Sequence, residues 1–265
     1  MGVTVTRRAK DFKQPRGGLV PLKSFTVEHL EDGRALSKGE NLNAGTVGMV
    51  VDNLARLLSK PASWSTGLPL APVTPGDAFA IAFLGAKKIS SSDLENAQGY
   101  ANLVSGLDDA SIVNACKLTA YEPCFRAGAS AFKDPETMIP DQNTIENIRT
   151  MVSRCVEFFS ARGPITCLGP IFKGGYTDTV SKGDGDLLTI DAIWDIKTSV
   201  KKPTPKDTLQ VYMYYLMGKR SIEPAFEPIT KIGVFNPRLH EAYTLAAEDI
   251  SESVKDTVER EVIGY

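Results

Sequence analysis

The chain has 265 residues, of which 42% are apolar and 23% are charged, and its net charge at pH 7 is −2. These values are typical of a folded globular protein and argue against a generic nucleic-acid coat protein, which would be strongly basic. No apolar run approaches the ~20 residues that a membrane-spanning helix needs, and the amino terminus lacks the apolar segment of a signal peptide. We therefore expect a cytoplasmic protein with no membrane contact.

Four cysteines are present, without the C-x-x-C spacing of metal or redox sites: Cys116, Cys124, Cys155 and Cys167. They fall within stretches that have the pattern of helix and strand interiors. The sequence therefore predicts buried free thiols in a reducing compartment.

The first 42 residues show little periodicity and several turn signals, so we expect an arm with a short strand or helix near Leu22 to Leu30. A basic cluster from Arg7 to Lys23 holds six cations against Asp11, which is typical of a solvated surface or of a nucleic-acid contact. From Ala44 to Ser59, apolar residues recur at helical spacing and predict an amphipathic helix.

Residues 60–77 contain four prolines and predict an extended loop. Helical patterns follow at about 77–88, 91–106 and 109–122, and the second helix is expected to open on a capping box from Ser92 to Glu95. Together with the arm, these elements form an N-terminal helical region over residues 1–140. Its helix at 44–59 can alternatively be assigned to the core formed by the C-terminal half. The helices at about 77–122 contain no catalytic motif of their own.

Residues 141–265 show a different order of elements. A helix with a buried stripe is expected to open at Asn143 and to end at Gly163-Pro164. The elements expected after it are strands at about 165–173, 184–190 and 193–199, a helix at 206–218, strands at 229–236 and 240–245, and a helix at 247–261. This α-β-β-β-α-β succession predicts an α/β fold with a mixed sheet flanked by helices.

The second and third of these strands carry the candidate site. With a two-residue turn at Asp191-Ala192, position 186 falls opposite 197, and 188 falls opposite 195. Strand side chains alternate between faces, so Asp195 and Lys197 share one face, and neighbours across the strands lie roughly 5 Å apart. The pattern therefore brings Asp186, Asp195 and Lys197 together.

Two converging carboxylates repel each other unless a cation neutralises them. A hard divalent ion held by carboxylates, a carbonyl and waters is a common solution, and Mg²⁺ is the expected ion, with Mn²⁺ as its substitute. A neighbouring lysine can orient or deprotonate a water, or stabilise charge on a phosphate oxygen. The alternative is a solvated strand face with a weak ion pair.

Three motifs resemble the PD-(D/E)XK nuclease superfamily, and in particular its RecB-like branch: Gly183-x-x-Asp186, Asp195-Ile196-Lys197-Thr198 and Gln210-x-x-x-Tyr214. The resemblance implies that Asp186 and Asp195 bind the metal, with the Ile196 carbonyl as a third ligand. It also implies that Lys197 serves the attacking water, and that Gln210 and Tyr214 brace the site or touch nucleic acid. The expected core is a restriction-endonuclease-like αβββαβ domain over residues 141–265.

Two further sets of residues are weaker candidates. Gly48-x-x-x-Asp52 stands where the RecB-like family often has Gly-x-x-x-His, so Asp52 is either an additional metal ligand or a surface carboxylate. Lys201, Lys202 and Lys206 follow the Asp195-Ile196-Lys197 strand, where a phosphate backbone would pass the metal. We expect these lysines to contact DNA.

The sequence thus predicts a Mg²⁺-dependent nuclease that hydrolyses DNA phosphodiester bonds, as an exonuclease or an endonuclease. One alternative is a non-catalytic DNA-binding or assembly protein that keeps the nuclease fold, and another is an RNA-directed nuclease. The chain has no G-x-x-x-x-G-K-[ST] loop and no G-x-S-x-G elbow. These absences argue against an ATP-driven motor and a serine hydrolase.

Overall fold

The computed structural model describes residues 2–59 and 73–265, and the contacts between them divide the chain into two units. The sheet unit comprises residues 2–31 and 159–265, and the helical unit comprises residues 32–59 and 73–158. The boundary expected near residue 140 therefore differs from this division, because residues 2–31 join the sheet and the first part of the helix at 142–161 joins the other helices. Most of the loop expected at 60–77 lies outside the described residues.

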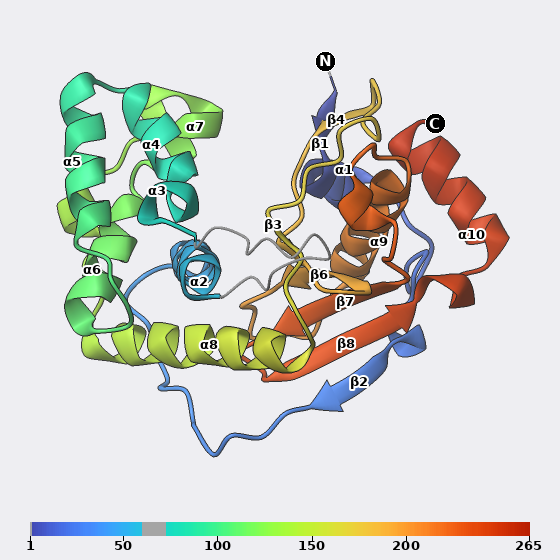
Figure 1. The fold of residues 1–265 in the computed structure, drawn as a ribbon, viewed down its shortest axis with the longest axis horizontal. Coiled ribbons are helices and arrows are strands. Elements are labelled where there is room, and N and C mark those ends of the chain that lie inside the picture. The colour runs from blue at the N-terminus through green and yellow to red at the C-terminus, as the bar shows by residue number, and fades with distance from the viewer. Residues whose placement is uncertain (1, 60–72) are drawn as a thin grey trace. The chain divides into compact units, whose positions relative to one another are not determined.

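The sheet unit is built on one mixed sheet of six strands (Figure 1). Its order is β2 (Thr26–His29), β8 (Glu241–Ala246), β7 (Lys231–Asn236), β6 (Ala192–Ile196), β5 (Leu187–Leu188) and β3 (Cys167–Leu168). β6 and β7 are parallel, and the other neighbouring strands are antiparallel. The predicted α/β class with a mixed sheet is confirmed. A separate parallel pair joins β1 (Val3–Thr4) to β4 (Val180–Lys182), and β4 was not predicted.

The helix between the two parallel strands is α9 (Pro205–Lys219), which packs on β6 and β7. Pro205 occupies its first turn, and Thr204 and Asp207 form a capping box, a combination that favours a helix start. Ten of its fifteen residues are buried, so the helix is apolar on most sides and lies within the core. On the opposite face of β6, Trp194 meets Phe159 edge to face, with ring centroids 5.9 Å apart.

The element order expected for the C-terminal half is confirmed, although the strands before α9 are shorter than predicted. α8 (Gln142–Ala161), β3, β5, β6, α9 and β7 follow one another along the chain. Asp141 caps α8 by accepting the N–H of Thr144, so the expected opening at Asn143 is wrong by about one residue. After β8, the helix expected at 247–261 consists of a 3₁₀ turn, α10 (Glu252–Thr257) and a π-helical segment (Val258–Ile263).

The short strand or helix expected near Leu22 to Leu30 is confirmed, but the prediction of an otherwise irregular arm over the first 42 residues is wrong. Residues Val5–Asp11 form α1, whose Thr4 cap accepts the N–H of Arg7, and the side chains of Val5 and Ala9 are buried. The segment continues through a 3₁₀ turn (Leu22–Ser24) to β2, an edge strand that pairs with β8. A seven-residue helix with two buried positions is too short to produce a recognisable periodic pattern.

The helical unit contains the amphipathic helix expected at 44–59, which is confirmed as α2. Its helices are α2 (Ala44–Leu58), α3 (Pro75–Ala78), α4 (Ala80–Lys87), α5 (Ser91–Asn102), α6 (Asp109–Leu118), α7 (Glu122–Ala127) and most of α8. The predicted cap of α5 at Ser92 is wrong. The cap is Ser90, whose side chain accepts the N–H of Asp93. Further 3₁₀ turns lie at Ala129–Ala131, Pro135–Thr137 and Pro224–Phe226.

All four cysteines are free thiols, as predicted. Cys116, Cys124 and Cys155 are buried, and Cys167 is partly exposed. Burial raises the pKa of the Cys116 thiol to about 12, so this side chain behaves as a small apolar group. Within the described ranges, no helix has the length and apolar character required to cross a bilayer.

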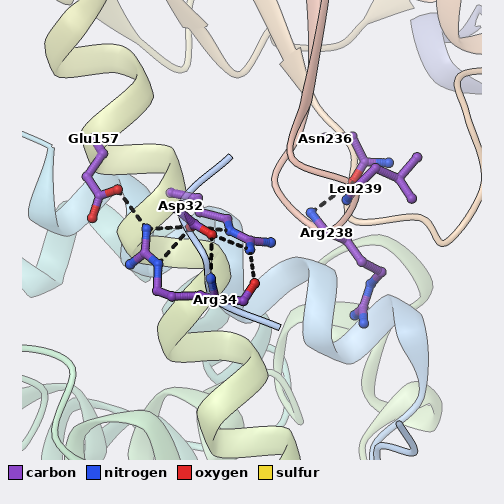
Figure 2. A network of polar contacts seen from close by, with 7 residues as sticks. Asp32, Arg34, Glu157, Asn236, Arg238 and Leu239 are labelled. Atoms are coloured by element: carbon purple, nitrogen blue, oxygen red, sulfur yellow. Dashed lines mark hydrogen bonds and ion pairs between the residues drawn. The ribbon is translucent and has the colours of Figure 1, made fainter. Parts of the chain in front are cut away.

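An ion-pair network holds the start of the helical unit against α8 (Figure 2). The Arg154 side chain is 5% exposed, and its Nε and Nη2 lie 2.7 and 2.9 Å from the two carboxylate oxygens of Asp32. Arg34 also contacts Asp32, and its Nη2 lies 2.7 Å from Glu157 Oε2. The hydrogen bonds from Arg154 hold the pKa of Asp32 well below its ordinary value.

Replacing Asp32 by Asn should lower the free energy of unfolding at pH 7 by about 3 kcal/mol, because it leaves the Arg154 guanidinium buried without its carboxylate. The folded-state pKa of Asp32 is depressed, so its contribution is present above the unfolded value of about 4 and is lost as pH falls through the lower folded value. Urea unfolding at neutral and acidic pH should therefore show the difference between wild type and Asp32→Asn shrinking in acid. Glu157→Gln, at an exposed partner, should cost less than about 1 kcal/mol; equal effects of the two changes would contradict this assignment.

Candidate active site

The candidate site lies at the hairpin formed by β5 and β6. Leu187 pairs with Trp194, Leu188 pairs with Ile193, and the N–H of Thr189 donates to the carbonyl of Ala192 over 2.9 Å. The turn residues are therefore 190 and 191, and the predicted turn at 191 and 192 is wrong by one residue.

This correction moves the strand pairing by two positions, and side chains alternate with a period of two, so the faces stay as predicted. Extended by one residue, the observed register places Asp186 opposite Asp195 rather than opposite Lys197. Asp186 lies just before β5, and its Oδ2 accepts the backbone N–H of Ile196 over 2.6 Å. Both carboxylates therefore lie on one face at the end of the hairpin.

Asp195 is the most buried member of the site, with 1% of its surface exposed. Gln210 donates from Nε2 to Asp195 Oδ1 over 3.0 Å, and Lys197 Nζ lies 2.8 Å from Asp195 Oδ2. An ionised carboxylate in such surroundings is tolerated only when a cation and hydrogen-bond donors accompany it. The amide and the ammonium supply both.

Lys197 follows β6 and keeps the strand's backbone pairing, since its N–H donates to the carbonyl of Phe235 over 2.9 Å. Its side chain is 26% exposed. Burial lowers its pKa, but the carboxylates of Asp195 and Asp186 raise it by more, so the pKa lies above its ordinary value. Lys197 is therefore an ammonium group at neutral pH in this structure.

Gln210 and Tyr214 lie one turn apart on α9 and act as a pair. The Gln210 amide nitrogen donates to Asp195 and also to the Tyr214 hydroxyl, at 2.7 Å. Tyr214 is 3% exposed and its ring stacks on Phe172 with centroids 5.3 Å apart. Burial, with the two nearby carboxylates, raises the pKa of Tyr214 well above its ordinary value, so the phenol stays neutral. The pair fixes the orientation of the Asp195 carboxylate.

Gly183 of the first motif has a conformational role. Its φ is +141°, a region that L side chains rarely adopt, and a Cβ there would lie 2.8 Å from Cγ2 of Val5. The chain can therefore pass α1 closely at this point before it reaches Asp186.

Three residues around the site were missed by sequence reasoning. The Thr6 side chain on α1 lies beside the Tyr214 hydroxyl and acts to lower its pKa. The fully buried Asn236 accepts the N–H of Arg238 (Figure 2) and donates to the carbonyl of Ser199 over 2.8 Å. Arg238 Nε donates to the carbonyl of Thr198 over 2.7 Å. Asn236 and Arg238 hold the backbone that follows Lys197. For Asn236, the sequence did contain a signal: the Asn236-Pro237 dipeptide at the end of an apolar strand indicates a turn at this point.

The weaker candidates are not joined to this cluster by any described contact. Asp52 lies on α2 of the helical unit and pairs with Arg56, with Oδ2 3.0 Å from Nη2. Its role as a metal ligand stays a prediction. Lys201 and Lys202 are exposed on the segment between β6 and α9, Lys206 is exposed in the first turn of α9, and the contact of all three with DNA is likewise a prediction.

The donor set suits a hard divalent cation. Asp186 and Asp195 contribute two negative charges against the single positive charge of Lys197, so the cluster carries a net charge of −1. Among the described residues, no group of three or more His, Cys, Asp or Glu side chains is suited to a metal. A Mg²⁺ ion would therefore take the two carboxylates, the Ile196 carbonyl and waters, which is the ligand set this ion favours.

Comparison with known proteins found no matching family model, no similar curated protein and no similar solved structure. The chemistry of this cluster is therefore the basis on which a function can be assigned.

Tyr214→Phe should reduce the free energy of unfolding by about 1–2 kcal/mol, because it removes the acceptor of a buried Gln210 N–H. Tyr215→Phe is the matched control, since Tyr215 is only partly buried and stacks on Tyr212 with centroids 6.1 Å apart. Urea unfolding of the two variants should separate them by about 1 kcal/mol. A Tyr214→Phe protein as stable as Tyr215→Phe would show that the hydroxyl does not support Gln210.

Proposed function

We propose that this protein is a metal-dependent nuclease that hydrolyses phosphodiester bonds in DNA. The observation that carries the proposal is the buried Asp195 carboxylate, which shares one strand face with Asp186 and contacts both Lys197 and Gln210. A buried ion pair adds little stability relative to apolar side chains of the same volume, so stability alone does not account for this cluster. Buried charges with perturbed pKa values are concentrated at functional sites.

The arrangement of elements supports the same proposal. α8, β3, β5, β6, α9 and β7 come in the order of the αβββαβ succession of the PD-(D/E)XK superfamily, with β4 of the separate two-stranded pair between β3 and β5. The three motifs lie on or next to the corresponding elements. We therefore propose a restriction-endonuclease-like core of the RecB-like branch, in a cytoplasmic protein.

Each residue of the cluster has a distinct task in the proposed reaction. Asp186, Asp195 and the Ile196 carbonyl would hold a Mg²⁺ ion, which would supply Lewis-acid polarisation of a phosphoryl oxygen. The Lys197 ammonium orients the attacking water and stabilises negative charge on the phosphate. Gln210 keeps the Asp195 carboxylate in one orientation, and Tyr214 keeps the Gln210 amide in place.

The bond changes are those of an in-line displacement. The water oxygen forms a bond to phosphorus, the bond from phosphorus to the 3′ oxygen breaks, and the departing 3′ oxygen takes up a proton. The products are a 5′-phosphate and a 3′-hydroxyl, as the resemblance to the superfamily implies.

Purified protein should cleave DNA in the presence of Mg²⁺ or Mn²⁺ and should be inactive in EDTA. Lys197→Ala and Asp195→Asn should each lower the cleavage rate by roughly 10²–10³-fold or more, because each removes charge stabilisation at the transition state. Comparing linear with circular DNA distinguishes exonuclease from endonuclease action. Comparing single-stranded DNA with an RNA strand of the same sequence shows which nucleic acid is the substrate.

Lys231→Ala and Asp191→Ala are the matched controls, because these residues form an exposed ion pair at 2.8 Å in the same sheet. Both should retain full activity, and thermal unfolding of all variants checks that the fold survives. Undiminished activity of Asp195→Asn would place the catalytic centre elsewhere. Binding of DNA without metal-dependent cleavage by the wild-type protein would identify a non-catalytic binding protein instead.

A further inference from the structure

The amino-terminal segment runs antiparallel to α9, alongside the candidate site. At one end, α1 packs on α9, and Thr6 lies beside Tyr214 in the third turn of α9. At the other end, Gln14 Nε2 donates to the carbonyl of Pro205 over 2.9 Å, and a Cβ on Gly18 would lie 2.8 Å from the Pro205 side chain. Residues 6–18 therefore follow α9 from the site back to its first residue.

The orientation of α1 decides which of its cations lie beside the site. Val5 and Ala9 face the core, and Arg8 lies on one flank, where its Nε donates to the carbonyl of Val262 over 2.7 Å. Thr6 and Lys10 are one turn apart on the opposite flank. Because Thr6 meets Tyr214, this flank of α1 faces the site, and Lys10 is exposed on it.

The same path joins two basic clusters that are distant in sequence. Lys13 and Arg16 are exposed on either side of Gln14, which contacts Pro205, and Lys206 is exposed directly after Pro205. We name the combined surface the basic track and define it by six exposed residues: Lys10, Lys13, Arg16, Lys201, Lys202 and Lys206. Among residues 2–59 and 73–265, none of the six forms an ion pair with an acidic side chain.

The charge of the basic track contrasts with that of the chain. Six cations gather there although the whole chain carries a net charge of −2. The nearest acidic residues in sequence are engaged elsewhere, since Asp11 pairs with Arg7 and Asp207 accepts the N–H of Thr204 over 2.7 Å. A local positive potential of this kind attracts polyanions.

We propose that the basic track binds the phosphate backbone of a nucleic-acid strand and leads it to the cluster of Asp186, Asp195 and Lys197. The direction of the strand toward that cluster depends on the proposed nuclease function, whereas the binding itself does not. The nine-residue rise from Pro205 to Tyr214 is about 14 Å, which equals the axial length of about four phosphates on one strand of a duplex. A group of exposed cations along the same flank as a carboxylate pair suited to Mg²⁺ fits a phosphate chain.

The test measures binding without cleavage. Fluorescence anisotropy of a labelled single strand and a labelled duplex, in EDTA and over a range of salt concentrations, is compared for the full-length wild type and two triple variants. One is Lys10→Gln, Lys13→Gln and Arg16→Gln; the control is Lys173→Gln, Lys231→Gln and Lys255→Gln, at surface positions elsewhere in the sheet unit. Both variants lose three positive charges, so their net charges are equal.

We expect the track variant to bind the duplex roughly tenfold or more weakly, and to reduce the slope of log affinity against log salt by about 2–3, since each lost phosphate contact removes about 0.9 from the slope. The control variant should keep the wild-type slope. A further triple variant in the other half of the basic track, Lys201→Gln, Lys202→Gln and Lys206→Gln, should show a similar reduction in the salt slope. Circular dichroism and thermal unfolding establish that all variants are folded.

Equal slopes for the track and control variants would overturn the proposal, as would a wild-type protein that binds neither probe at low salt. Binding of anionic lipid vesicles or of heparin through these residues, without binding of nucleic acid, would overturn it too. The cleavage assay distinguishes this proposal from the nuclease assignment. Wild-type protein that binds through the basic track but does not cleave with Mg²⁺ would refute the nuclease and leave the track supported.

Discussion

The structure of the sheet unit depends on keeping one ionised carboxylate out of water. Asp195 lies on β6, whose neighbours β5 and β7 flank it on both edges and whose face is covered by α9. A charge in this position is stable only with a cation and directed hydrogen bonds beside it, and Lys197 and Gln210 meet that requirement. The pairing register of the hairpin and the rotation of α9 about its axis must both satisfy these two contacts at once.

The same requirement explains why polar residues occur on a helix that is otherwise apolar. Gln210 and Tyr214 are buried on α9 among leucine, valine and methionine side chains, and each satisfies the other. A half-satisfied polar network would cost more than an apolar core. Because aliphatic residues at these positions would serve folding as well, the network supports the proposed chemical role of the carboxylate that it orients.

The site is assembled from both ends of the sheet unit's sequence. Val3 pairs with Val180, Val5 packs against Gly183, and Thr6 reaches Tyr214, so the first helix supports the segment that leads to Asp186. The amino-terminal residues therefore belong to the sheet unit that carries the candidate site rather than to an appendage. This placement also brings cations from residues 10–16 beside those of residues 201–206.

The sequence by itself determined the features that depend on local periodicity. Alternation along a strand assigned Asp195 and Lys197 to one face, a four-residue spacing assigned Gln210 and Tyr214 to one side of a helix, and apolar runs identified β6, β7 and α9. Only the tertiary structure decided the position of the hairpin turn, the helical state of residues 5–11, and the contacts of Thr6, Asn236 and Arg238. Thr6 and Tyr214 are separated by about 200 residues, and packing rather than propensity selects such contacts, so no local pattern announces them.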